Sequence, residues 1–215
     1  MFDQFDPYTL LLGFIALAAI IVLAVMFTRK NSHKGQDIGR RGHRRVSGVL
    51  RSFARLRGFR VLDHVVLPAA SGSGTVTIDH VLVGFFGLLF VTDLTRDGDY
   101  YGSVKEPTWS CTTRRDPEGT TIAEKVASIP NPLIANDKAR EAALRVFSKQ
   151  NIYNLRIESM VVASSGASVF YISGGEGQVT PVNKLRQALD STRFEADKGL
   201  DVGKIAHVLE EASLS

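Results

Sequence analysis

The chain contains a single cysteine. It also has one long stretch with few acidic residues and another with no charged residue. Its 215 residues include one cysteine, Cys111, which excludes an intrachain disulfide and is explained most simply by a reducing compartment. With 44% hydrophobic and 22% charged residues, the composition is that of one globular domain with an appendage.

The stretch without charge is Tyr8–Phe27, near the N-terminus. At 1.5 Å per residue, a helix of this length crosses a hydrocarbon core of roughly 30 Å. A cleaved signal peptide is the first alternative, but the preceding segment is acidic and no pair of small residues marks a cleavage site. A buried core helix is the second, although no face of the run is polar. The sequence therefore predicts a transmembrane helix over residues 8–28.

The charges that flank this run are asymmetric. Asp3 and Asp6 precede it, and the residues that follow it are basic: Arg29, Lys30, Lys34, Arg40 and Arg41. Because positive flanks stay in the cytoplasm, residues 1–7 are expected outside, residues 29–38 form a basic linker, and residues 39–215 form a cytoplasmic domain. The expected location is an inner or plasma membrane, crossed once.

The region from Arg29 to Arg60 is poor in acidic residues. Within it, apolar residues recur at helical spacing over about residues 39–57 and predict an amphipathic helix. The opposite face carries Arg40, Arg44, Arg51 and Arg55. These charges fit an anionic lipid surface or nucleic-acid phosphates, and no interleaved aromatic residues mark a stacking platform.

The remaining pattern predicts a mixed α/β domain. After the basic helix come three or four strands, a helix opening at Asn131–Leu133, two further strands, and two final amphipathic helices. Residues Arg114–Thr121 are polar and predict a loop, and the Gly174–Gly177 cluster predicts a turn because no phosphate-binding helix follows it. The expected architecture is a central mixed sheet flanked by helices.

Two acids stand out in the stretch Thr75–Gly102. Asp79 and Asp93 each lie in an apolar strand, and a tight turn containing glycine joins the two strands. Burial of an unpaired carboxylate costs several kcal/mol. The pair therefore indicates a metal, a basic partner or a strand end open to water.

The order of several short motifs resembles the nuclease-related domain (NERD) family. The motifs are Gly39-Arg40-Arg41-Gly42-His43, Ile78-Asp79-His80, Gly87 to Thr95, Trp109 and Asn131-Pro132-Leu133-Ile134-Ala135. The resemblance covers roughly residues 39–147 and implies a PD-(D/E)xK, restriction-endonuclease-like fold. In that fold, carboxylates hold Mg²⁺ for phosphodiester hydrolysis, which would be the role of Asp79 and Asp93.

The same resemblance exposes three departures. His43 replaces the family's helix glutamate, Thr95 its strand lysine and Ala135 its glutamine. Lys105 could supply the missing charge from the following segment. His43 could act as a base or metal ligand, or be an ordinary core or surface histidine.

Two hypotheses remain open. In the first, the domain is a non-catalytic binding or structural module with a degenerate nuclease-like site, beside the membrane and within a protein complex. In the second, it is a Mg²⁺-dependent nuclease that uses Asp79 and Asp93, assisted by Lys105 or His43. The loss of three characteristic side chains favours the first.

Overall fold

The computed structural model describes residues 40–96, 98–113, 125–164, 168–175, 178–191, 194 and 196–214. A helix over residues 40–55, here called the first helix, opens this part of the chain. The elements that follow are β1 (Arg60–Pro68), β2 (Thr75–Gly84), β3 (Gly87–Leu94), β4 (Asp99–Ser103), β5 (Thr108–Thr113), β6 (Lys125–Pro130), α2 (Pro132–Lys149), β7 (Ile157–Ala163), β8 (Phe170–Ser173), β9 (Val179–Pro181), α3 (Val182–Leu189) and α4 (Val202–Ala212).

The strands form two mixed sheets. The larger sheet has the order β1-β2-β3-β7-β9, antiparallel from β1 to β3 and parallel from β3 to β9. The smaller sheet has the order β6-β5-β4-β8, and only its β4–β8 pair is parallel. Gly87, with φ +132°, begins β3 directly after the turn at residues 85–86, and a Cβ there would lie 2.2 Å from the Arg156 carbonyl oxygen.

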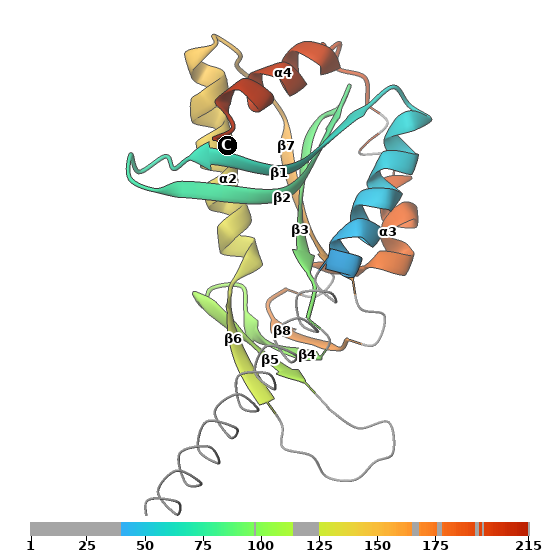
Figure 1. Cartoon of the computed structure of the whole chain (residues 1–215), viewed down its shortest axis with the longest axis vertical. Coiled ribbons are helices and arrows are strands. Elements are labelled where there is room, and N and C mark those ends of the chain that lie inside the picture. Colours follow the sequence, from blue (N-terminus) through green and yellow to red (C-terminus); the bar gives the residue numbers. More distant parts are fainter. Residues whose placement is uncertain are drawn as a thin grey trace, which may run out of the picture. The chain divides into compact units, whose positions relative to one another are not determined.

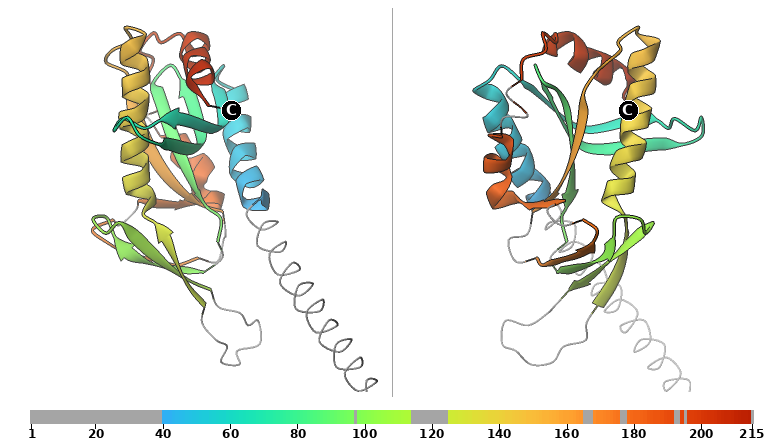
Figure 2. Two further views of the ribbon diagram at one scale, coloured as in Figure 1. Left: turned by 60° about the vertical axis from the view of Figure 1, so that its left-hand side comes forward. Right: turned by 180° about the vertical axis from the view of Figure 1, so that it is seen from behind.

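Helices cover both faces of the larger sheet (Figures 1 and 2). On one face α2 and α4 bury an apolar cluster that includes Val83, Phe90 and Phe147. On the other face the first helix and α3 enclose a second cluster around Phe53, Leu89 and Leu185. Alternate residues of β3 therefore belong to different cores, which explains its continuously apolar sequence.

The predicted α/β fold with a mixed sheet flanked by helices is confirmed, but the prediction of one central sheet is wrong. The segment around Tyr100 and Trp109 belongs to a second sheet with its own small core. Strands β6 and β9 were not predicted, because one is short and mixed in polarity and the other has three residues.

The predicted membrane-spanning helix, residues 8–28, and the linker at residues 29–38 lie outside the described residues. Among the helices that the structure does describe, none is both long enough and apolar enough to cross a bilayer.

Candidate functional site

Charged side chains meet where the first helix crosses β1, β2 and β3. His80 is at their centre, with no exposed surface. Its Nδ1 lies 2.5 Å from Oδ1 of Asp63, and its Nε2 lies 2.9 Å from Oδ2 of Asp93. His43 completes the group through its Nδ1, 3.0 Å from the same oxygen of Asp93. We call these four residues the histidine–aspartate cluster.

An irregularity in the β1–β2 ladder directs two members of the cluster toward the first helix. Asp63 pairs with His80 and Val65 with Ile78, which leaves His64 and Asp79 without ladder partners. His64 has φ +56°, which is uncommon for a residue other than glycine. Val65 and Ile78 therefore pack on the α2 side of the sheet, although strict alternation would place them with Asp63 and His80.

Spacing along the first helix supplies the opposing groups. His43, Ser47 and Arg51 are four residues apart and so form one stripe. Ser47 Oγ donates to Asp63 at 3.0 Å, and Arg51 forms an ion pair with Asp63. The helix approaches closely because it has glycine at residue 42, where a Cβ would lie 2.2 Å from Ser164 Oγ.

Asp79 contacts the cluster through the backbone. Its Oδ2 accepts a hydrogen bond of 2.9 Å from the amide nitrogen of Asp93. The side chain of Asp93 is 2% exposed, and its Oδ1 has no hydrogen-bond partner among the described residues. The two acids singled out in the sequence therefore do lie together, and the groups that contact their carboxylates are histidine rings and a backbone amide.

The environment shifts the pKa values in the cluster. Burial would lower the pKa of His80, but hydrogen bonds and charge from Asp93 and Asp63 raise it above its usual 6.5. Burial would raise the pKa of Asp63, but its bonds with His80, Arg51 and Ser47 lower it below 3.8. Burial raises the pKa of Asp93 against the opposing effect of His80. Ionised carboxylates only accept hydrogen bonds, so with both carboxylates ionised His80 would donate from both ring nitrogens, as an imidazolium ion does.

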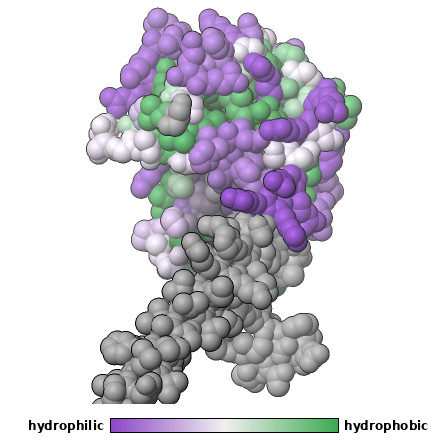
Figure 3. Space-filling view, in the orientation of Figure 1, coloured by the Kyte–Doolittle hydropathy of each residue, from purple (hydrophilic) through white to green (hydrophobic). Residues whose placement is uncertain are grey.

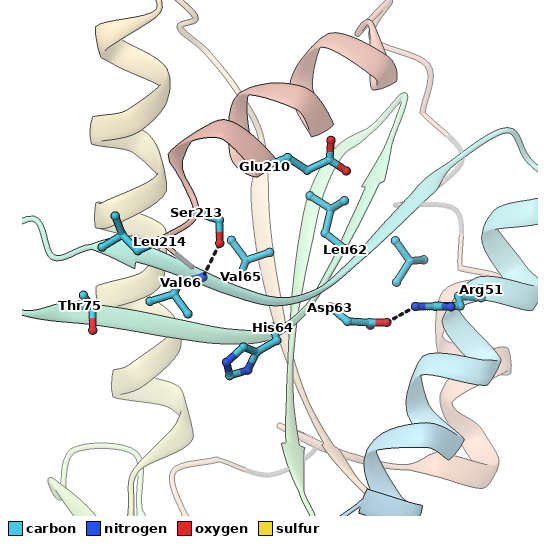
Figure 4. A pocket seen from close by; sticks show the side chains of 11 residues that line it. Arg51, Leu62, Asp63, His64, Val65, Val66, Thr75, Glu210, Ser213 and Leu214 are labelled. Carbon is cyan, nitrogen blue, oxygen red and sulfur yellow. Dashed lines mark hydrogen bonds and ion pairs between the residues drawn. The ribbon is translucent and has the colours of Figure 1, made fainter.

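The cluster reaches solvent at its two ends. The His43 side chain is 35% exposed, and its ring stacks on that of His80 with centroids 4.1 Å apart. At the other end Asp63 is 21% exposed and lines a cavity of about 790 Å³ beside β1. Figure 4 shows Arg51 and Asp63 meeting at this cavity. His43, oriented by a buried carboxylate, has the arrangement of a general base.

The structure separates the other residues singled out in the sequence from this cluster. Lys105 is exposed in the turn between β4 and β5 of the smaller sheet. Arg40, Arg44 and Arg55 are also exposed; Arg51 is exposed as well but, unlike the others, it contacts the cluster through its ion pair with Asp63. The residue after Ala135, Asn136, is buried on the opposite face of β3, where it accepts a hydrogen bond of 2.7 Å from Thr92 Oγ1.

These residues leave few free oxygens for a Mg²⁺ ion. Mg²⁺ requires near-octahedral oxygen ligands and usually retains several waters. Oδ2 of Asp93 is already within hydrogen-bond distance of two imidazole rings, and Oδ2 of Asp79 already accepts a hydrogen bond from a backbone amide. The carbonyl oxygen of Leu94, the residue after Asp93, accepts hydrogen bonds from the amide and the hydroxyl of Ser164. Two carboxylate oxygens are left among these groups: Oδ1 of Asp93, on a side chain with almost no exposed surface, and Oδ1 of the partly buried Asp79.

Within the described part of the chain, His43, Asp63 and His80 bring potential ligand atoms within 4.8 Å of one another. Two imidazoles and a carboxylate match Zn²⁺ or Mn²⁺ better than Mg²⁺. However, each ring nitrogen of His80 already lies within hydrogen-bond distance of a carboxylate oxygen, so neither nitrogen is free to bind a metal ion in this arrangement.

Asp63 and His80 were missed in the sequence, although both carried a signal. Asp63 interrupts an apolar strand, and His80 directly follows Asp79 in the Ile-Asp-His motif. Their meeting depends on strand register and on the irregularity at His64, which hydrophobic periodicity does not encode.

Comparison with protein families identifies one match. The model of the nuclease-related domain matches residues 38–164, which is more than half of the chain and includes the whole cluster. No curated protein and no solved structure matches the chain significantly.

Proposed function

Because the chain belongs to the nuclease-related domain family, we propose that it is a nucleic-acid-binding module that holds its ligand without cutting it. The observation that carries this proposal is His80, fully buried between Asp63 and Asp93. An imidazolium at this point would neutralise Asp93, one of the two carboxylates that a nuclease of this family would offer to metal ions.

The position of Thr95 supports the same proposal. The family's lysine at this position brings a charge to the attacking water and the phosphate, which a threonine cannot do. A Cβ on Gly42 would lie 3.4 Å from the Thr95 methyl carbon, so this side chain abuts the first helix. Lys105, the candidate substitute, is exposed in the smaller sheet.

The proposal predicts binding without cleavage. The purified full-length chain should retain labelled DNA or RNA in a mobility-shift assay, while gel electrophoresis shows intact strands after incubation with Mg²⁺, Mn²⁺ or Zn²⁺. An Asp79→Ala variant should behave like the wild type in the cleavage assay. Metal-dependent cleavage that Asp79→Ala abolishes would instead establish the nuclease hypothesis.

We further propose that residues 8–28 anchor the domain to a membrane, with the domain in the cytoplasm and a protein complex as its setting. The uncharged run and its asymmetric flanks support this proposal. The full-length chain should stay with membranes through alkaline carbonate extraction, and protease added to intact cells should spare the C-terminus. Release by carbonate would refute the anchor. Co-purification through a C-terminal tag tests for the complex.

A further inference from the structure

A second basic feature lies beside the cluster, between the first helix and α3. These helices lie side by side on one face of the larger sheet (Figures 1 and 2). They enclose a groove of about 570 Å³. Its lining residues are Arg44, Arg45, Gly48, Val49, Ser52, Val182, Asn183 and Arg186. The lining thus combines three arginines with hydroxyl, amide and apolar groups, and contains no acid.

Two of the three guanidinium groups are held in place. Arg186 Nε donates to Asp190 at 3.3 Å, and its guanidinium carbon lies 5.3 Å from the centre of the Phe53 ring. Arg45 donates to the Ser164 carbonyl oxygen at 3.4 Å. Arg44 has no ion-pair partner among the described residues. Cations held in place on both walls lose less conformational entropy when an anion binds between them.

The groove is connected to the histidine–aspartate cluster. Arg44 and Arg45 directly follow His43 in the first helix. Ser164, which Arg45 contacts, donates to the carbonyl of Leu94, the residue after Asp93. Figure 3 shows deeply hydrophilic side chains over the lower half of the first helix. An extended polyanion in the groove would therefore also pass the exposed edge of His43.

The size of the groove restricts the ligand. A volume of about 570 Å³ is that of a site for a small molecule or a few nucleotides. A double helix is too wide to enter between the two helices, whereas a single strand can place its phosphates between the arginines. The apolar floor at Val49 and Val182 can contact sugars or bases.

From this arrangement we infer that the groove is a binding site for the sugar–phosphate backbone of single-stranded nucleic acid. The inference rests on the proposed function and deepens it, because it names the strand type and the contacting residues. It differs from the face of the first helix singled out in the sequence, since it includes Arg45 and Arg186 and excludes Arg51.

Fluorescence anisotropy of a labelled oligothymidylate tests this inference on the full-length chain. The Arg44→Ala, Arg186→Ala double variant should lose at least about tenfold in affinity at low salt. Its slope of log affinity against log salt should become about 1.4 shallower, for two phosphate contacts. The matched control is Lys138→Ala, Arg140→Ala, which removes two exposed charges from α2. It should change the affinity less than about twofold.

Each other outcome has a distinct meaning. If the wild-type chain binds no oligonucleotide, the proposed function fails. If the wild type binds and the groove variant matches the α2 control, the inference fails while the proposed function stands. Equal binding of a duplex, with the same dependence on Arg44 and Arg186, would overturn the assignment to a single strand. If a water-soluble, short-chain phosphatidylserine bound the wild type but not the groove variant, while both still bound the oligonucleotide, the groove would be assigned to lipid. The groove variant should unfold within about 2 °C of the wild type, because its one surface ion pair contributes little.

Discussion

Replacement of His80 by alanine is expected to lower the free energy of unfolding by about 3–5 kcal/mol, because it leaves a buried carboxylate without its cation. Asp93 would keep the hydrogen bond from His43, and Asp63 would keep Arg51 and Ser47. The decrease in stability therefore comes mainly from Asp93, whose side chain is 2% exposed. Equilibrium unfolding in urea, followed by circular dichroism, measures the change.

A surface histidine provides the control for this variant. His207 also faces a carboxylate, that of Glu211 at 3.2 Å, but its side chain is 67% exposed on α4. His207→Ala should cost less than about 0.5 kcal/mol. A double variant, His80→Leu with Asp93→Leu, should be more stable than His80→Ala, because it removes the unpaired charge and restores buried volume. A cost for His80→Ala no larger than that for His207→Ala would contradict the role assigned to the cluster.

Stability should fall as the solution becomes alkaline, and His80 should cause much of that fall. The pKa of His80 is raised above 6.5 in the folded chain, so its stabilisation is complete below 6.5 and disappears as the pH rises through the folded pKa. Asp63 acts at the acid end. Its folded pKa is lowered below 3.8, so its stabilisation is present above 3.8 and is lost as the pH falls through the folded value. Together they stabilise the fold most between these limits.

Urea unfolding of the wild type and of His80→Gln at several pH values tests this second effect. The difference in unfolding free energy between the two chains should be largest at mildly acidic pH and should shrink steadily on the alkaline side. A difference that stays constant from acid to alkaline pH would mean that His80 acts through packing and not through charge.

Much of the larger sheet follows from local sequence. The β2–β3 hairpin is predictable because its strands are apolar and Gly87 allows the turn. The helical spacing of Val46, Leu50 and Phe53 likewise predicts the buried face of the first helix. The division into two sheets is not predictable in this way, because local patterns do not state which strands pair.

The candidate site was predictable in part. Asp79 and Asp93 were found because charged residues in apolar strands need partners. Which partners they have depends on tertiary contacts. His43 is fifty residues from Asp93 in the chain, and it reaches the carboxylate because Gly42 lets the helix approach β3. The same spacing of four residues that brings His43 to Asp93 also lets Arg51, which is exposed as the sequence predicts, reach Asp63.

We propose that His80 is a cation between Asp63 and Asp93, and that it takes Asp93 away from any metal ion. The most direct measurement is the ¹⁵N chemical shifts of the His80 imidazole near its ordinary pKa of 6.5, assigned by comparison with His80→Gln. Both ring nitrogens should be predominantly protonated, and millimolar Mg²⁺ should leave their shifts unchanged. A neutral ring with one protonated nitrogen, or shifts that move as Mg²⁺ binds, would show that His80 is not a cation that excludes the metal.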